Sequence, residues 1–228
     1  MSELNHLAII MDGNRRWAKS NNLSTFEGHS AGYEKLKEVG KWCIGKGIKT
    51  LTVYAFSIEN WNRNEKEVSY LMKLLRNVFN DEVSEFSKLG VRVNVIGSRS
   101  KLKKKVLESI DKIQEMTKDN TEGVLNLCIN YGGRLEIVEA VKDIVKKGYK
   151  GEDITEELID EHTWFADQPA PDLIIRTSGE QRLSGFLTWA SVYSEFYFPK
   201  CTWPEFDESE LDKAIEEYNN RHRRFGGS

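Results

Sequence analysis

The stretch IIMDGNRRWA, at residues 9–18, places an acidic side chain after an apolar run and two arginines directly behind it. The glycine and asparagine between them favour the start of a helix, where free backbone N–H groups attract an anion. Arg15 and Arg16 add guanidinium groups suited to phosphate oxygens. Asp12 would repel that anion unless a cation lay between them, so the stretch predicts a diphosphate bound with Mg²⁺. A plain helix N-cap is the alternative interpretation of Asp12.

A second cluster occurs in IIRTSGEQRLS, at residues 174–184. Arg176 and Arg182 flank a Ser-Gly turn, and Ser184 follows two residues later. Two guanidinium groups and a hydroxyl can bind a second diphosphate. A surface ion pair with Glu180 is the alternative. Two diphosphate sites and one metal-binding carboxylate together suggest a reaction that joins two phosphorylated substrates.

Both clusters follow apolar runs that are typical of buried strands, and helical periodicity separates those runs. Such alternation indicates a parallel sheet covered on both faces. Strands are expected at 6–11, 49–56, 91–97, 124–130 and 172–177, with a weaker one at 195–198. Helices are expected at about 30–46, 65–89, 101–118, 133–147, 155–162 and 208–222. The prediction is a single α/β domain over residues 1–228, with a central, mostly parallel sheet of about six strands flanked by helices.

The positions of the polar clusters agree with that fold class. Ligands of open parallel sheets bind beyond the carboxyl ends of the strands. Polar or basic groups follow four expected strands, at 12–16, 57–63, 130–134 and 176–182. Turn chemistry explains any one of them alone, but four on one edge favour a shared anion site.

The overall composition limits the possible partners. The 228 residues carry a formal net charge of −3, which gives no global attraction to nucleic acid, so an anion site must be local. No apolar stretch approaches the ~20 residues that cross a bilayer. The N-terminus lacks the features of a signal peptide, and the three scattered cysteines favour reduced thiols. We therefore expect a cytoplasmic protein with no nucleic-acid partner.

Apolar residues repeat at helical spacing along one face of the segment 65–89. Such a face usually packs into a core. It could equally line an apolar tunnel, with Tyr54, Phe56 and Trp61 near the mouth. The face consists of Val68, Leu71, Met72, Leu75, Val78, Phe79, Val83 and Phe86.

These motifs, taken together, resemble those of the cis-prenyltransferases, the undecaprenyl diphosphate synthase family. The resemblance runs from residue 6 to residue 227, and its blocks occur in the same order as in the family. Besides HLAIIMDGNRRWA, the matching blocks are GHSAG (28–32), YAFSIENWNR (54–63), NYGGR (130–134), DLIIRTSGEQRLS (172–184), YSEFYF (193–198) and RRFGG (223–227).

The resemblance implies a head-to-tail condensation of isopentenyl diphosphate with an allylic diphosphate, with farnesyl or geranyl diphosphate as the expected primer. Each addition creates a Z double bond through Mg²⁺-assisted ionisation, attack and proton loss. The apolar tunnel would shelter the carbocation and hold the growing chain. The family is dimeric, so a homodimer is expected, and the lipid product makes peripheral membrane contact an expectation too.

The resemblance also assigns residues of this chain to roles. The catalytic residues would be Asp12 and Asn60, with Asp12 and Glu195 as metal ligands. The allylic substrate would contact Gly13, Asn14, Arg15, Arg16, Trp17, His29, Ser57, Trp61 and Arg63. Isopentenyl diphosphate would contact Arg176, Arg182, Ser184, Arg224 and Gly226. The last two form the R-x-G element, which in the family reaches the active site of the partner across the dimer.

The chain departs from the family pattern at Thr25, where most members carry an arginine four residues before the histidine of GH. Arg15, where many bacterial members have glycine, is the candidate replacement. Two alternatives stay open. One is a catalytically silent scaffold subunit, although Asp12 and both arginines of the second cluster are retained. The other is an enzyme that makes short or branched products. The small Ala55 favours a medium or long product, whereas Ile129 could narrow the tunnel.

Overall fold

The computed structural model describes residues 4–81 and 83–221, without the side chains of residues 81 and 83–85. Six strands form one sheet in the order β3-β4-β2-β1-β5-β6, and every neighbouring pair is parallel. The strands are β1 (His6–Ile10), β2 (Thr50–Ser57), β3 (Val91–Ile96), β4 (Gly123–Tyr131), β5 (Leu173–Arg176) and β6 (Glu195–Tyr197). This arrangement confirms the predicted fold class and all six expected strands.

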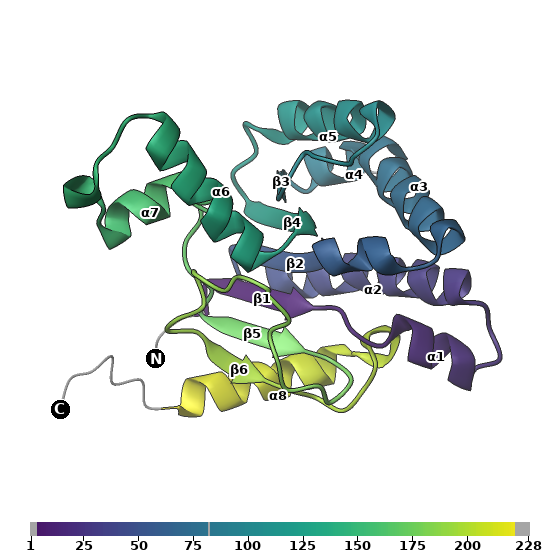
Figure 1. Ribbon diagram of the computed structural model, residues 1–228. Coiled ribbons are helices and arrows are strands. Elements are labelled where there is room, and N and C mark those ends of the chain that lie inside the picture. The colour runs from purple at the N-terminus through teal and green to yellow at the C-terminus, as the bar shows by residue number, and fades with distance from the viewer. Residues whose placement is uncertain (1–3, 82, 222–228) are drawn as a thin grey trace.

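Helices flank the sheet, with α2 on one side and α6 on the other (Figure 1). The helices are α1 (Asn14–Ser20), α2 (Thr25–Gly45), α3 (Glu65–Asp81), α4 (Val83–Lys88), α5 (Lys104–Thr117), α6 (Gly133–Lys146), α7 (Glu156–His162) and α8 (Glu208–Asn220). Short 3₁₀ turns occur at η1 (Ile58–Asn62), η2 (Gly151–Asp153) and η3 (Trp203–Glu205). Among the described residues, none of the helices has the length and apolar character needed to cross a membrane.

The two faces of the sheet pack against separate apolar clusters, because side chains alternate along each strand. On β1, Leu7 and Ile9 belong to the larger cluster, which also takes in buried residues of α2, α3, α5 and α8. Ala8 and Ile10 belong to the smaller cluster with Phe165 and Phe186. Both faces are thus covered, as a parallel sheet requires, and the strand ends remain as the edge where polar groups can gather.

The start of α2 corrects one expectation of the sequence analysis. Periodicity placed this helix at about residue 30, but it begins at Thr25 behind a capping box. The Ser24 side chain accepts a hydrogen bond from the backbone N–H of Glu27, and the Glu27 carboxylate accepts one from the backbone N–H of Ser24. The Ser-x-x-Glu pattern in the sequence is the known signature of such a box. Its consequence is that Thr25 and His29 lie on one rigid helix.

Candidate active site

The backbone of Asp12 is fixed between the ends of β1 and β5. Its carbonyl oxygen accepts hydrogen bonds from the Thr177 hydroxyl (2.6 Å), the Ser178 hydroxyl (3.0 Å) and the backbone N–H of Trp203 (2.9 Å). The next residue, Gly13, has a φ of 106°, and a Cβ there would lie 2.1 Å from Ser178 Oγ. Only glycine fits that position, so the loop holds the Asp12 carboxylate in one place.

The Asp12 carboxylate lies between one arginine from each sequence cluster. Its Oδ2 atom accepts a hydrogen bond from Arg176 Nη2 at 2.9 Å, and its Oδ1 atom lies 3.5 Å from Arg16 Nη2. The Asp12 side chain is 30% exposed, whereas that of Arg176 is 6% exposed. The two predicted diphosphate clusters therefore meet at a single carboxylate, as the strand register, with Ile10 opposite Arg176, requires.

Arg176 connects Asp12 to the rest of the second cluster. Its Nη1 atom donates to Ser184 Oγ at 2.8 Å and to the backbone carbonyl of Arg182. The Arg182 guanidinium pairs with Glu180, which is the surface ion pair considered as the alternative in the sequence analysis. Arg176 is thus a buried structural centre of the site, while Arg182 is an exposed group whose pairing a phosphate could replace.

A wide pocket, which we call the near pocket, opens at this edge of the sheet. Its walls include most of the predicted allylic residues together with Thr25, Tyr54 and Ala55. The predicted residues that line it are Asp12, Gly13, Asn14, Arg15, Arg16, His29, Asn60 and Arg63. Asn14 Oδ1 and Arg176 Nε are buried without a hydrogen-bond partner among the described residues. Such atoms are costly to leave unpaired, so the polar packing around Asp12 is incompletely satisfied among the described residues.

Glu67 is a site residue that the sequence analysis missed. It is 3% exposed, and its Oε1 atom accepts hydrogen bonds from His29 Nε2 (3.1 Å) and Arg63 Nη1 (3.0 Å). Burial lowers the pKa of His29, so the imidazole is neutral near pH 7. Burial alone would raise the pKa of Glu67, but the His29 hydrogen bond and the charge of Arg63 hold it below its usual value. The i, i+4 spacing of Arg63 and Glu67 was the available signal.

Three predicted allylic residues lie outside the lining of the near pocket. Trp61 donates from Nε1 to Asn130 Oδ1 at 2.7 Å and packs edge-on against Phe56. Trp17 lies on α1, half-buried, away from the lining. Ser57 contributes indirectly, because its backbone N–H donates to Asn60 Oδ1 at 3.1 Å. The segment after β2 therefore presents Asn60 and Arg63 to the pocket and directs Trp61 into the core.

The structure does not bring Glu195 to Asp12 within one chain. Glu195 pairs with Leu173, three residues before Arg176, and so lies about 10 Å from the strand ends along the sheet. Its Oε2 atom accepts a hydrogen bond from Arg221 Nη1 at 2.6 Å. Among the described residues, no cluster of three or more acidic, histidine or cysteine side chains could hold a metal ion. The predicted contacts Arg224 and Gly226 lie outside the described residues.

Comparisons with known proteins decide the family. The family model described as "Putative undecaprenyl diphosphate synthase" matches residues 10–226. The chain is 49% identical to an isoprenyl transferase of Clostridium tetani over 97% of this chain and 89% of that protein. It is also 49% identical to an isoprenyl transferase of Fusobacterium nucleatum, over 97% of this chain and 95% of that protein. The chain belongs to the undecaprenyl diphosphate synthase family.

Solved structures of similar proteins agree with this assignment. The crystal structure of lavandulyl diphosphate synthase from Lavandula x intermedia, in complex with dimethylallyl diphosphate, superposes with a TM-score of 0.93 at 36% identity, covering 97% of this chain and 98% of that chain. A Campylobacter jejuni protein described as a probable undecaprenyl diphosphate synthase gives 0.83 at 34% identity, covering 99% of this chain and all of the other. The expected fold and the expected prenyl transferase activity are confirmed.

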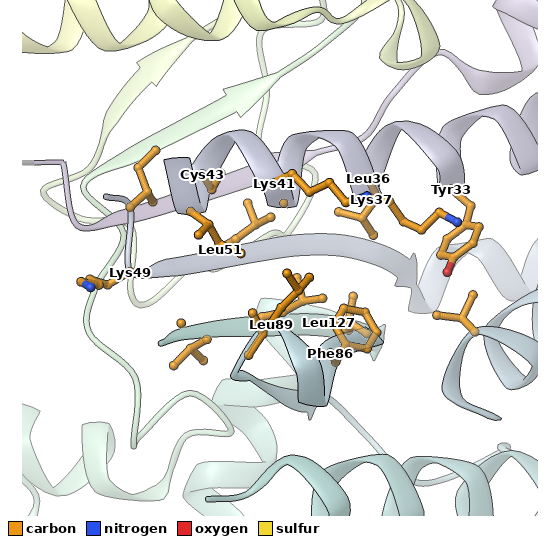
Figure 2. A pocket seen from close by; sticks show the side chains of 18 residues that line it. Tyr33, Leu36, Lys37, Lys41, Cys43, Lys49, Leu51, Phe86, Leu89 and Leu127 are labelled. Atoms are coloured by element: carbon orange, nitrogen blue, oxygen red, sulfur yellow. The ribbon is translucent and has the colours of Figure 1, made fainter. Parts of the chain in front are cut away.

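Two apolar cavities lie behind the near pocket of this undecaprenyl diphosphate synthase family member. The first, the inner cavity, shares Met11, Ala55 and Leu71 with the near pocket. The second, the far chamber, encloses about 70 Å³ of space that a water molecule can reach, and it shares Leu36 and Val78 with the inner cavity. Figure 2 shows Tyr33, Leu36 and Cys43 along α2 on one side of the far chamber, with Phe86 and Leu89 on the other.

Part of the apolar face of α3 and α4 lines cavities and part packs into the core, while a tunnel stays a prediction. Leu75 and Val78 line the inner cavity, and Phe86 lines the far chamber. Phe79, in contrast, is fully buried in the larger core cluster. Ile129 is also a core residue and lines none of the three cavities, so it does not narrow them.

Proposed function

We propose that this chain condenses isopentenyl diphosphate with an allylic diphosphate to give a Z-polyprenyl diphosphate. The observation that best supports this proposal is the position of the Asp12 carboxylate between Arg16 of the first cluster and Arg176 of the second. Two diphosphates bound by these clusters would lie on either side of one acid, which is the arrangement that joining two such substrates needs.

The allylic diphosphate would bind in the near pocket. Arg16 and Asn14 line the same pocket as His29, and the charges of Arg15 and Arg63 both act on the His29 imidazole. When the allylic C–O bond breaks, the leaving diphosphate takes the electron pair. The arginines then stabilise the charge that develops on it, and because they are held in place beforehand, little reorganisation is needed. Arg15 would supply the positive charge missing at Thr25.

Isopentenyl diphosphate would bind at the second cluster, through Arg176, Arg182 and Ser184. Its double bond attacks the allylic carbon, a new C–C bond forms, and loss of a proton from the adjacent carbon leaves the Z double bond. We assign assistance in that proton loss to Asn60, which lines the near pocket with Asp12 and is oriented through its Oδ1 contact with the Ser57 backbone.

The residues at Asp12 fit a magnesium ion. Mg²⁺ is usually held by one or two carboxylates together with substrate phosphates and water. Asp12 Oδ2 is occupied by Arg176, but Oδ1 has only the longer contact with Arg16 and is partly exposed. Asp12 would hold the ion through Oδ1. When bound, the ion would supply further positive charge against the leaving diphosphate.

We also propose a homodimer. The family's R-x-G element corresponds to Arg224 and Gly226, and Glu195 does not reach the Asp12 of its own chain. If Glu195 acts beside an Asp12, a second copy of the chain would supply it, and the resemblance assigns the R-x-G element to the same role across a dimer. Peripheral contact with a membrane is proposed only for the release of the lipid product.

A second candidate is a short, branched product. It is favoured by the similarity to lavandulyl diphosphate synthase, which superposes with the higher TM-score of the two solved structures. The apolar cavities behind the near pocket favour the long-chain reaction instead, because a branched product made from two small units would leave the far chamber empty.

Incubation with radiolabelled isopentenyl diphosphate and Mg²⁺ tests the proposal. Dimethylallyl, geranyl and farnesyl diphosphate are supplied in turn, and products are sized by thin-layer chromatography beside an Asp12→Ala control. A ladder that ends at a defined length, absent in the control, supports the long-chain synthase. One short product, formed only from dimethylallyl diphosphate, supports the branched candidate. No incorporation from any primer, with the fold intact, overturns both and indicates a subunit that needs a catalytic partner.

A further inference from the structure

The three cavities lie along α2 and run from one edge of the sheet to the other. The near pocket contains His29 of α2 and Ala55, near the carboxyl end of β2. The far chamber contains Ile44 of α2 and Lys49, just before the amino end of β2. At 1.5 Å per residue, the helix carries the lining from His29 to Ile44 over about 22 Å. Neighbouring cavities share lining residues, so the three adjoin in a row, in the direction that an apolar chain anchored at its diphosphate end would take.

The far chamber opens to solvent at its distal end. Ile44 is 41% exposed and Leu89 is 37% exposed, although both line an otherwise apolar cavity. Lys41 and Lys49 stand at the same rim as exposed residues. The described residues at this rim are thus partly exposed rather than buried. The limit on product length must therefore come from the side walls of the far chamber rather than from its distal end.

Gly40 is the unusual residue in those walls. It lies on the same face of α2 as Leu36 and Cys43, and all three line the far chamber. A Cβ atom at Gly40 would meet nothing within 4 Å. Glycine in the interior of a helix is unfavourable compared with alanine, and no close contact at Gly40 requires it.

Other glycines of α2 show what a packing requirement looks like. A Cβ at Gly28 would lie 2.4 Å from the Asn14 carbonyl oxygen, and one at Gly32 would lie 2.4 Å from Asn14 Oδ1. Those two glycines let α1 approach α2. Gly45 resembles Gly40 in having open space at its Cβ position, but it does not line the chamber. Only Gly40 combines open space with a place in the chamber wall among these four.

We propose that Gly40 sets the product length by leaving the far chamber open to the apolar end of the growing chain. This inference rests on the proposed synthase function. Each condensation occurs at the diphosphate end, which the near pocket holds, so each added unit must push the apolar end further along α2. Burial of that end stabilises the longer intermediate relative to its release into water. A side chain at position 40 would occupy the space that the chain needs.

The test is a series of full-length variants, Gly40→Ala, Gly40→Leu and Gly40→Phe, with Gly45→Phe as the matched control on the same helix. Product lengths are measured from radiolabelled isopentenyl diphosphate and dimethylallyl diphosphate, and the first condensation is timed separately. Gly40 lies about 16 Å along α2 from His29, beyond a short primer. We expect the product to shorten stepwise with the size of the side chain at position 40, while Gly45→Phe gives the wild-type length.

Several outcomes would overturn the inference. Wild-type product length in Gly40→Phe would do so, as would equal shortening by Gly45→Phe. If Gly40→Phe does not fold, as judged by thermal melting, Gly123→Ala tests the opposite wall, since a Cβ there would lie at an ordinary 3.6 Å from the Lys49 carbonyl oxygen. That variant is expected to shorten the product, and no shortening would count against the chamber. Loss of all incorporation by the wild-type protein would instead refute the synthase function itself.

Discussion

The near pocket and the far chamber are built in opposite ways. At the near pocket, charged groups hold one another in place. Asp12, in the pocket wall, contacts Arg16 and Arg176, and Arg176 also donates hydrogen bonds to Ser184 and to the Arg182 backbone. In the far chamber, mostly apolar walls surround open space, and a Cβ atom at Gly40 would meet no atom within 4 Å. Bond breaking needs atoms at fixed positions, whereas chain length needs volume. Changes in the first region should therefore alter rate, and changes in the second should alter product size.

Asp12→Ala is the substitution with the largest expected effect. It removes the carboxylate shared by both clusters and the proposed Mg²⁺ ligand. Removing one preorganised group at a developing charge costs ~10²–10³ in rate, and this change removes the ion as well, so we expect a loss of about 10³-fold or more. Initial rates of incorporation at saturating Mg²⁺ measure it. Asp12→Asn, which keeps the shape, should lose nearly as much, and near wild-type activity in either variant would contradict the assignment.

Arg176→Lys should have the next largest effect. Lysine keeps the charge but cannot reproduce the fork of donors that serves Asp12, Ser184 and the Arg182 carbonyl. We expect a loss of about 10²-fold in kcat/KM for isopentenyl diphosphate, the size typical of one lost preorganised donor. Arg182→Lys is the comparison variant: Arg182 is also a proposed diphosphate contact, but it is exposed and its side chain pairs with Glu180, so we expect a smaller loss. Equal losses in the two variants would show that burial of Arg176 does not matter.

Glu67→Gln should weaken the near pocket without abolishing it. The variant keeps an acceptor for His29 but loses the charge that Arg63 contacts. A hydrogen bond to a charged group contributes about 1.5–3 kcal/mol, so we expect a fall of roughly 10-fold in kcat/KM for the allylic substrate. Because Glu67 raises the pKa of His29, that pKa should fall further, as followed by NMR titration. An unchanged titration would remove Glu67 from the site.

His6→Gln lies outside both regions and should change neither rate nor product length near neutral pH. His6 is fully buried at the amino end of β1, bonded to the Pro169 carbonyl and the Thr52 hydroxyl, and burial lowers its pKa to about 4. Between about pH 6.5 and 4 the unfolded chain binds a proton that the folded chain does not, so the free energy of unfolding falls as the pH falls. The full loss is on the order of 3 kcal/mol.

Denaturant unfolding across this pH range measures the effect as the difference between wild type and His6→Gln. Subtraction is needed because burial raises the pKa of Glu136 to about 6, which stabilises the folded chain as the pH falls through that value. The Glu136 contribution cancels between the two proteins. A difference that does not depend on pH would contradict the buried, neutral state of His6.

The sequence predicted most of this architecture for identifiable reasons. Both faces of the sheet are covered, so the strands are largely apolar, and even the three-residue β6 was expected. The position of Asp12 directly after β1 and of Arg176 at the end of β5 made their meeting a consequence of parallel pairing. The sequence thus predicted the site best at strand ends, because in a parallel sheet the direction of the strands alone decides which side chains lie at the same edge.

Contacts between helices that are distant in the sequence could not be predicted in the same way. Glu67 meets His29 only because α3 packs beside α2, and no local pattern encodes that approach. Glu195 was predicted as a metal ligand from its motif, but the motif does not reveal how far Glu195 lies from the carboxyl end of the sheet. Cavity-lining and core residues of α3 share one apolar face, so periodicity could not distinguish Leu75, which lines the inner cavity, from Phe79, which is fully buried in the core.

The open space beside Gly40 has a consequence for how such an enzyme can diversify. Most new functions are reached through substitutions that cost stability. At Gly40, replacement by alanine should add about 0.5–1 kcal/mol to the stability of the helix, and its new side chain meets no neighbour. Selection for a different lipid could therefore act at this position without a compensating mutation, whereas Gly28 and Gly32, pressed against Asn14, offer no such route.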